Sequence, residues 1–421
     1  MNTLRQRIEP LQYRLSILPA ARRHQDACLR RVREKARASV VFIVSSLSMW
    51  RFQELYEKLR QDTRFSLHFA LYPFPSFGLE QRKTSIEEIC AYCEEHDIAY
   101  LNLSQEEFPG AVLREQLQPD ILFYQQSYNQ LYNNDLDAPF QVKSLNCYIP
   151  YSIRTSTGAW VYRNYLSETA WRLFYCAELH REEAGRILYN KGRNICVVGD
   201  CMLDNLATAS GRDVWKPQEK PKKRVIWAPH FSILDGDFLH RDSFTWVSEC
   251  MLEMAQKYQE QIQFAFKPHP RLLSELQKHP SWGEIKAKAY YDRWKNGANT
   301  QLECGPYSDL FKGSDAMIHD SGSFSVEYHF TGKPVMFTSR DMAESVQGQN
   351  ELGREGILAH YQGANKDDIC SFLENVVLAG TDPMKPVRLA FCEKYFPSYK
   401  EGKAAGRIYH EILKGLNFKE A

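Results

Sequence analysis

The sequence predicts an α/β protein built from two parallel-sheet domains. Apolar, strand-like runs alternate with helical patterns along most of the chain, which is typical of a parallel sheet covered by helices. The 421 residues, of which 43% are hydrophobic, are enough for more than one core. A polar stretch ending in "DVWKPQEKPKKR" separates two such alternating series. We therefore expect two Rossmann-like domains of similar size.

The first domain is predicted to span residues 39–206. It opens with "SVVFIVSS" (39–46), an apolar run long enough for a strand buried on both faces, and the helical pattern "FQELYEKLRQD" follows it. Further strand-like runs, separated by helical or polar segments, occur at 65–72, 98–103, 120–126, 144–152, 171–178 and 194–200.

A linker is predicted at 207–223, because two prolines and a lysine run interrupt the pattern there. The second domain, 224–400, repeats the alternation, and a helix is expected at 401–421. Its predicted strands lie at 224–232, 262–270, 300–305, 315–323 and 333–339.

The first 38 residues are predicted to be a basic, amphipathic helical segment. Residues 1–40 carry ten Lys/Arg and three Asp/Glu, although the whole chain has a formal charge of only +1. The apolar positions, three or four residues apart, are Leu4, Ile8, Leu11, Leu15 and Leu18, with Arg5, Arg7 and Arg14 between them. Such a helix can lie on anionic lipid or pack against its own domain, and the pattern leaves both open.

The expected location is the cytoplasm, with peripheral contact at the inner face of the cell membrane. No secretory signal is apparent, and the most apolar stretch, "VVFIV", is far shorter than the roughly 20 residues of a spanning helix. Eleven cysteines are scattered without a framework pattern, so reduced thiols are expected. Charge confined to one end and one linker argues against nucleic-acid binding.

Three predicted strands of the second domain end abruptly in polar residues. Ligands of open α/β sheets bind at the carboxyl ends of strands, so these ends are expected to share one site. The residues are His230 after the first strand, Lys267, His269 and Arg271 after the second, and His319, Asp320, Ser321, Gly322 and Ser323 after the third. Cations and a small-residue turn at a helix start favour a polyanion, such as the phosphates of a nucleotide-activated donor. When each of these strand ends is considered singly, an ordinary helix cap or a His-Pro turn without a ligand explains its polar residues as well.

Several motifs resemble the CDP-glycerol glycerophosphotransferase family of teichoic-acid and capsule polymerases. They are "KPHPRL", "HDSGSFSVEYHFTGKPVMF" and "EGKAAGRI", with "VIWAPHFS" and "VVGDCMLDNL" before them. The family's D-x-S-S-x-x-x-D-Y pattern and later proline are met by Asp320, Ser323, Glu327, Tyr328 and Pro334, with Gly322 where the first serine usually falls. The resemblance covers roughly residues 140–415. It implies a GT-B architecture, in which two Rossmann-like domains face each other across a cleft.

The resemblance also implies a transfer of glycerol phosphate or ribitol phosphate from a CDP-alditol to an acceptor hydroxyl, with release of CMP. The acceptor is expected to be a cell-surface polysaccharide, a teichoic-acid-like polymer or a lipid-linked chain. We expect His269, with Lys267 or Arg271, to contact the diphosphate. Ser321, Gly322 and Ser323 are expected to cradle it. Glu327 is expected to accept a hydrogen bond from a ribose hydroxyl. His230 is the expected general base, while Asp320 either serves as the base or holds a histidine.

One departure from the family leaves alternatives open. The family's W-H-G-T-P-x-K segment corresponds here to "NCYIPYSI" (146–153), which has no histidine. The alternatives are a GT-B glycosyltransferase that uses a nucleotide sugar, and a non-catalytic scaffold that binds nucleotide or polymer. No residue is assigned to a metal and no cofactor is assigned, with a divalent cation such as Mg left as an option.

Overall fold

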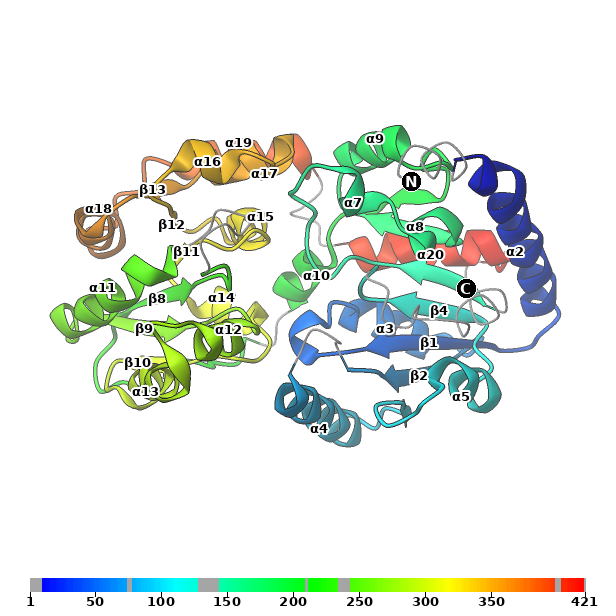
Figure 1. Ribbon diagram of the computed structural model, residues 1–421, viewed down its shortest axis with the longest axis horizontal. Helices are drawn as coiled ribbons and strands as arrows, with labels where there is room; N and C mark the ends of the chain where they lie inside the picture. The colour runs from blue at the N-terminus through cyan, green and yellow to red at the C-terminus, as the bar shows by residue number, and fades with distance from the viewer. Residues whose placement is uncertain are drawn as a thin grey trace. The chain divides into compact units, whose positions relative to one another are not determined.

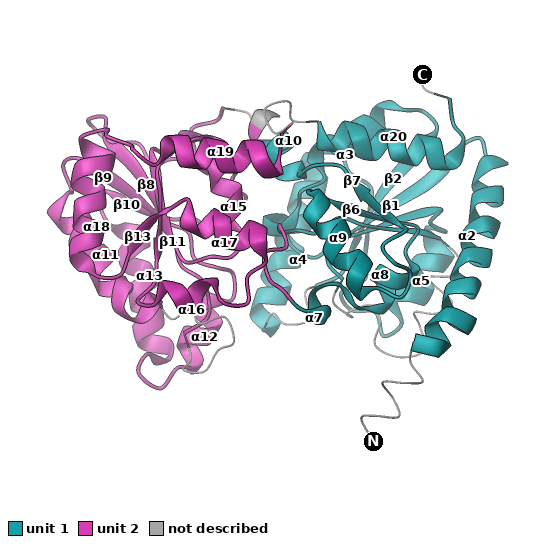
Figure 2. Cartoon of the chain, turned by 90° about the horizontal axis from the view of Figure 1, so that it is seen from above, with its two compact units in different colours: residues 1–152, 158–205, 401–421 teal, residues 153–157, 206–400 magenta. Residues whose placement is uncertain are grey.

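The computed structural model describes residues 10–73, 78–127, 144–208, 211–233, 243–397 and 403–419. They form two compact α/β units, shown in Figures 1 and 2. Unit 1 comprises residues 1–152, 158–205 and 401–421, and unit 2 comprises residues 153–157 and 206–400. Every strand pair recorded among the described residues is parallel within a named sheet, which confirms the predicted fold class.

Unit 1 contains a seven-stranded sheet with the order β3-β2-β1-β4-β5-β6-β7. The strands are β1 (Ala38–Val44), β2 (Phe65–Leu71), β3 (Tyr100–Asn102), β4 (Ile121–Tyr124), β5 (Leu145–Tyr148), β6 (Arg172–Tyr175) and β7 (Ile195–Val197). The central strands β1 and β4 are buried almost throughout, as expected of parallel strands covered on both faces.

The helices of unit 1 connect these strands and cover the sheet. They are α2 (Leu18–Arg33), preceded by a π-helical stretch at Tyr13–Ile17, then α3 (Gln53–Gln61), α4 (Leu79–Glu95), α5 (Pro109–Gln116), α7 (Ala159–Tyr162), α8 (Tyr165–Thr169), α9 (Glu178–Ile187) and α20 (Ala404–Leu416). The chain leaves unit 1 within α10 (Cys201–Thr208).

Unit 2 contains a six-stranded sheet with the order β10-β9-β8-β11-β12-β13. The strands are β8 (Lys223–Ala228), β9 (Ile262–Phe266), β10 (Thr300–Leu302), β11 (Ala316–His319), β12 (Val335–Thr338) and β13 (Tyr361–Gly363). Counted within the unit, this is the 3-2-1-4-5-6 order of the Rossmann fold, whose direction of winding reverses between β8 and β11.

The helices of unit 2 include several short turns. They are α11 (Phe244–Lys257), α12 (Leu272–Lys278), α13 (Gly283–Asn296), α14 (Ser308–Gly313), α15 (Phe324–Glu327), α16 (Met342–Val346), α17 (Glu351–Leu358), α18 (Lys366–Ser371) and α19 (Lys385–Tyr395). A 3₁₀ turn at Tyr328–Thr331 continues α15, and a π-helical stretch at Phe372–Leu378 continues α18.

Two segments belong to a different unit from the residues that precede them in the sequence. Residues 153–157 are part of unit 2, where Ser156 forms an antiparallel bridge with Gln349. Helix α20 is part of unit 1, where Ile408, Ile412 and Leu416 are fully buried in the core that contains β1. Its first turn is capped by the Asp204 carboxylate, which accepts hydrogen bonds from two backbone N–H groups of the helix.

The amino-terminal helix is anchored to unit 1 by its second half. Cys28 and Val32 are buried in the core, whereas Leu11 and Leu15 near its beginning are 58% and 76% exposed. The predicted stripe positions Leu4 and Ile8 lie outside the described residues.

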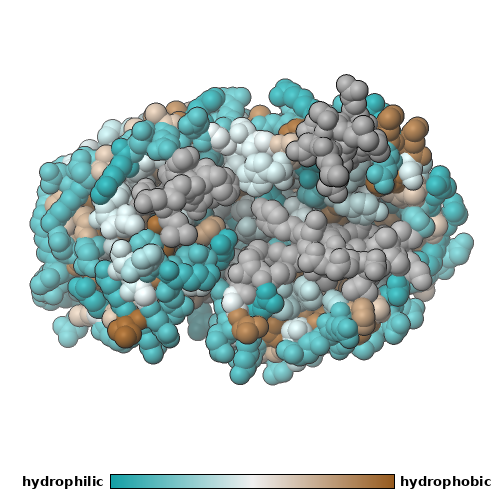
Figure 3. Space-filling model, in the orientation of Figure 1, coloured by the Kyte–Doolittle hydropathy of each residue, from teal (hydrophilic) through white to brown (hydrophobic). Residues whose placement is uncertain are grey.

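The face in Figure 3 is largely hydrophilic, with hydrophobic residues in small separate patches. No helix among the described residues is both long and apolar enough to cross a membrane. All eleven cysteines are free thiols, as expected from their scattered positions.

Candidate active site

Three adjacent strands of unit 2, β9, β8 and β11, carry the predicted site residues. These strands are parallel and in register, with Trp227 beside Phe266 and Ala228 beside His319, so their carboxyl ends lie at the same edge of the sheet. β8 and β11 also flank the position where the winding reverses, which is where open α/β sheets bind ligands. The three strand ends therefore lie at one edge of the sheet, and their sharing of one ligand site stays a prediction.

Asp320 holds the ends of β8 and β11 together. One carboxylate oxygen accepts a hydrogen bond from the backbone N–H of His230 at 2.6 Å, and the other accepts one from Ser243 Oγ at 2.6 Å. Only 1% of Asp320 is exposed. A carboxylate that accepts these two hydrogen bonds orients the loop after β8, which fits the expectation that Asp320 holds a histidine.

The His230 ring lies beside the His269 ring, with 5.1 Å between centroids. Its Nδ1 is 2.8 Å from Ser232 Oγ and 3.3 Å from the Ser232 backbone nitrogen. The backbone N–H of Ser232 donates to Nδ1, and while it does so a neutral His230 carries its proton on Nε2. The hydroxyl can donate or accept, so its hydrogen bond to Nδ1 is compatible with either tautomer. Sequence reasoning did not identify Ser232.

His269 is held between the loops that follow β8 and β9. Its backbone N–H donates to Pro229 O at 3.0 Å, and its Nδ1 accepts from the backbone N–H of Arg271 at 3.1 Å. A neutral imidazole whose Nδ1 is an acceptor carries its proton on Nε2. Burial, with the positive charges of Arg271 and Lys267, lowers the pKa of His269 to about 3. His269 is therefore neutral near pH 7 and can donate a hydrogen bond from Nε2.

Arg271 packs against the same loops. Its guanidinium lies over the Phe231 ring, 4.1 Å from the centroid, and Phe231 is 4.6 Å from the His269 ring. Arg271 also forms an ion pair with Glu275 at 3.3 Å, and its side chain is one-third exposed. The structure thus brings Arg271 close to His269 by way of Phe231.

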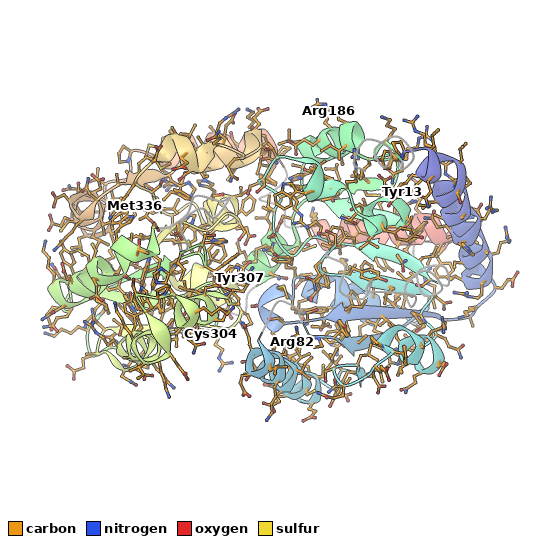
Figure 4. The ribbon with its side chains drawn as sticks, in the orientation of Figure 1. Tyr13, Arg82, Arg186, Cys304, Tyr307 and Met336 are labelled. Atoms are coloured by element: carbon orange, nitrogen blue, oxygen red, sulfur yellow. The ribbon has the colours of Figure 1, made fainter. Side chains whose placement is uncertain are left out.

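Lys267 instead points toward the loop after β10. Its Nζ donates to Gly305 O at 2.9 Å and lies 5.5 Å from the centroid of Tyr307, which is labelled in Figure 4. The Tyr307 hydroxyl donates to Glu327 Oε2 at 2.7 Å, and Glu327 is fully buried. Lys267 and Glu327 are therefore both connected to Tyr307, a residue that the sequence pattern did not single out.

The turn 321–323 lies between β11 and α15. Ser321 is buried and Ser323 is half-buried, and the Gly322 carbonyl accepts a hydrogen bond from Ser325 Oγ at 2.5 Å. α15 is only four residues long before it becomes a 3₁₀ turn, so only a short helix dipole stands behind this turn. Backbone N–H groups and hydroxyls are the donors that this turn can offer.

A chain of hydrogen bonds runs from the turn to α17. Ser321 N–H donates to His319 Nδ1 at 3.0 Å, His319 Nε2 is 3.1 Å from His360 Nε2, and His360 Nδ1 is 2.5 Å from Gly356 O. The carbonyl must accept, so His360 carries its proton on Nδ1 and accepts from His319 Nε2–H. Each ring in the chain is neutral with one defined tautomer. His360 was missed because nothing in the local sequence connects it to a strand end 41 residues earlier.

Stability is expected to fall as the pH drops below about 6.5. Burial lowers the pKa of His329 to about 4, of His269 to about 3, and of His360 well below its usual value. The unfolded chain then binds more protons below about pH 6.5, so each histidine lowers the free energy of unfolding by up to about 1.4 kcal/mol per pH unit until its folded pKa is reached.

Chemical denaturation at pH 7, 6 and 5 measures this effect. A His329→Asn variant keeps an amide donor toward Gly356 O, which His329 Nε2 contacts at 2.9 Å, but cannot titrate. Its free energy of unfolding should fall less steeply with pH than that of the wild type. Parallel curves for the two proteins would contradict the assignment.

The described residues contain no group of three or more His, Cys, Asp or Glu side chains placed to hold a metal ion. The positive charges that act on His269 are those of Arg271 and Lys267. The chemistry that this arrangement supports is the binding and orientation of an anion by neutral N–H donors and guanidinium.

Residues 170–414 match the family model described as CDP-Glycerol:Poly(glycerophosphate) glycerophosphotransferase. A solved variant of the wall teichoic acid polymerase TagF is similar with a TM-score of 0.63 at 11% identity, covering 99% of this chain and 98% of that chain. The same polymerase soaked with CDPG gives 0.58 at 12% identity, covering 99% and 98%. The UDP-GlcNAc 2-epimerase from Neisseria meningitidis, bound to UDP-GlcNAc, gives 0.56 at 15% identity, covering 90% and 100%.

At such identities the likeness to these structures establishes the fold alone. A sequence comparison with curated proteins gave no match.

Proposed function

We propose a function from the premise that the chain belongs to the CDP-glycerol:poly(glycerophosphate) glycerophosphotransferase family. In this proposal the protein moves a glycerol-phosphate or ribitol-phosphate unit from a CDP-alditol to a hydroxyl of a cell-surface polymer. The acceptor in this proposal is a polysaccharide, teichoic-acid-like or lipid-linked chain, and CMP is released. The observation that carries the proposal is the pairing of the His230 and His269 rings, 5.1 Å apart, where the winding of the unit 2 sheet reverses.

In the proposal, His269 donates its Nε2–H to the diphosphate of the donor, and Arg271 supplies positive charge beside it. The pKa of His269 is lowered by burial and by two neighbouring cations, so the neutral donor form is already present before the substrate binds. Preformed donors of this kind stabilise the charge that develops on the phosphates as the acceptor oxygen attacks and CMP leaves. Ser321, Gly322 and Ser323 are proposed to cradle the same phosphates.

His230 is the proposed general base. To accept a proton on Nε2, His230 must carry its own proton on Nδ1 and donate it to Ser232 Oγ, 2.8 Å away. This tautomer gives up the 3.3 Å hydrogen bond that Nδ1 accepts from the Ser232 backbone N–H. Asp320 is proposed to keep His230 in place through its backbone N–H. Ser232 thereby becomes a positioning residue in the proposed mechanism.

The remaining sequence candidates have smaller proposed roles. Lys267 is proposed to attract the phosphates by its positive charge without contacting them, because its ammonium group donates to Gly305 O. Glu327 is proposed to accept a hydrogen bond from a ribose hydroxyl. This bond would replace the one that Glu327 Oε2 now accepts from the Tyr307 hydroxyl.

No protein-bound metal is part of the proposal. Assays are run both with Mg²⁺ and with a chelator, because a diphosphate donor binds Mg²⁺ in solution by itself.

A cytoplasmic location with peripheral contact at an anionic membrane is also proposed. It is supported by the exposed Leu11 and Leu15 at the beginning of a helix whose second half is anchored in unit 1, because exposed leucines beside arginines suit an interfacial helix.

A donor panel tests the function. CDP-glycerol or CDP-ribitol at about 100 times its Kd should stabilise the protein by about 2.7 kcal/mol, since it binds only the native state. Melting temperature is measured with CDP-glycerol, CDP-ribitol, CMP, UDP-sugars and GDP-sugars, followed by CMP release and by analysis of the product linkage. A phosphodiester product is expected.

Other outcomes of the panel separate the alternatives. Stabilisation by a nucleotide sugar alone, with a glycosidic product, would identify a glycosyltransferase. Tight binding of a CDP-alditol without CMP release from any acceptor tried would identify a non-catalytic binding protein. Either result would overturn the proposed transfer.

A further inference from the structure

A pocket of about 510 Å³ lies in unit 1 between the amino-terminal helix and the loop before β7. It is lined by Arg14, Leu18, Pro19, Arg22, Tyr189, Asn190, Lys191 and Arg193. A second pocket of about 180 Å³ shares Leu18, Arg22, Asn190 and Arg193 with the first, so the two form one groove along the helix. Its size is within the range of small-molecule sites.

The larger pocket is positively charged and lacks counter-ions. Its lining has four cations and no Asp or Glu. The smaller pocket adds Arg172 and one acidic residue, Glu168, whose two oxygens accept backbone N–H groups. Within the described part of the chain, the side chains of Arg14, Arg22, Lys191 and Arg193 form no ion pair, whereas exposed arginines of the neighbouring α9 pair with glutamates. Four like charges around one concavity repel each other and attract an anion.

The loop that carries Lys191 and Arg193 is held rigidly. The Glu168 carboxylate accepts the backbone N–H groups of Tyr189 at 2.7 Å and Asn190 at 2.9 Å. Asn190 donates from Nδ2 to Ser167 O at 3.1 Å and to Glu168 O at 3.0 Å. Lys191 itself adopts a left-handed backbone conformation with φ of 61°, which is uncommon for a side chain other than glycine.

The opposite wall is equally fixed. Gln25 Nε2 of α2 donates to Thr169 O at 2.8 Å, and the end of the helix is buried in the unit 1 core. Tyr13, labelled in Figure 4, packs against Tyr189 with 4.9 Å between ring centroids, and the Arg163 guanidinium lies 4.9 Å from the centroid of Tyr189. A charged groove between two anchored walls is preorganised, so little ordering is needed when a ligand binds.

The groove is distinct from the candidate active site. Its residues come from the amino-terminal helix and from the segments that precede β6 and β7, at the amino ends of strands of unit 1, whereas the candidate active site lies at carboxyl ends of strands in unit 2. Neither the proposed donor chemistry nor the family motifs use these residues.

We propose that this groove binds phosphodiester groups of a glycerol phosphate chain. Arginine pairs with phosphate oxygens through two parallel hydrogen bonds, and two adjoining pockets that share Arg22 and Arg193 suit a linear ligand with repeated phosphates better than a single ion. The choice of a glycerol phosphate chain rests on the proposed function. The groove would hold phosphodiester units of the polymer other than the unit that reacts.

The test compares two double variants of the full chain. Arg22→Gln/Arg193→Gln removes two charges shared by both pockets, and neither side chain makes a hydrogen bond or ion pair within the described residues. Arg181→Gln/Arg186→Gln removes two charges from the exposed face of α9, where Figure 4 labels Arg186. Melting temperatures confirm that both variants fold. The probe is a soluble, fluorescently labelled poly(glycerol phosphate) chain, whose binding is followed by anisotropy at low and physiological salt.

The groove variant is expected to bind the chain at least tenfold more weakly than the wild type, and the α9 variant within twofold of it. An equal loss in both variants, or no loss in either, would overturn the proposal. Vesicles of phosphatidylglycerol are a second probe. If the groove variant loses binding to vesicles but not to the soluble chain, the groove recognises a lipid headgroup and the polymer proposal is wrong.

These measurements need no turnover. CMP release by the wild type, measured separately, tests the proposed function. A protein that releases no CMP but shows the difference between variants would refute the proposed function and leave the groove as a phosphate site.

Discussion

Replacing His269 by alanine is expected to lower the rate of CMP release roughly 10²–10³-fold, the usual cost of removing one preformed donor to a developing negative charge. The substitution removes the Nε2–H proposed to contact the diphosphate. It also removes the acceptor of the Arg271 backbone N–H, a hydrogen bond of 3.1 Å, whose loss costs only about 1 kcal/mol of stability. The variant should therefore fold and yet turn over poorly.

The chain offers a matched control for this variant. His279 also precedes a proline, and its Nδ1 also accepts a backbone N–H from two residues later, at 3.2 Å. It lies at the end of α12 and outside the candidate active site. His279→Ala should release CMP at close to the wild-type rate. Equal rates for the two variants would remove His269 from the mechanism.

The second large effect is on stability. Asp382→Ala is expected to lower the free energy of unfolding by about 3–5 kcal/mol, because it leaves the guanidinium of Arg388 buried without its carboxylate. The Arg388 side chain is fully buried, and Nη2 donates to Asp382. Its Nε and Nη1 have no hydrogen-bond partner among the described residues. Denaturant midpoints at pH 7 measure the loss.

A double variant distinguishes a lost ion pair from a lost contact. Asp382→Ala/Arg388→Met removes the buried charge as well as its partner, and an apolar side chain of similar length fills the space. Most of the lost stability should return, since replacing a buried ion pair by apolar groups is often neutral. If the double variant is less stable than Asp382→Ala alone, the damage comes from lost packing and hydrogen bonds, such as that of Tyr361 with Asp382, and not from an unpaired charge.

The positions of the candidate site residues could be predicted as far as backbone topology determines them. The apolar runs that became β8, β9 and β11 are buried throughout or nearly so, which makes such strands easy to recognise, and parallel strands place their carboxyl ends at one edge. This was enough to bring His230, His269 and Asp320 to the same edge. Strand β13 was not predicted, because its three residues "YQG" show no apolar pattern.

The contacts of individual side chains could not be predicted in the same way. Lys267 follows β9 in the sequence just as His269 does, but its ammonium group turns to a carbonyl on the loop after β10. Asp320 was weighed as a base, and the structure shows its carboxylate accepting the His230 N–H. His360 reaches His319 because Gly356 lets α17 approach α15 closely, where an added Cβ would lie 2.6 Å from Ser325 O. Such contacts depend on packing between elements distant in sequence.

The membership of α20 in unit 1 has a consequence for biosynthesis. Ile408, Ile412 and Leu416 complete the core around β1, yet they leave the ribosome only after every residue of unit 2 has been made. The nascent amino-terminal half therefore exposes an apolar strip until residues 404–416 have emerged, while residues 206–400 can already fold. A stop codon shortly before α20 should yield a polypeptide that aggregates or requires chaperones, although every predicted site residue is still present.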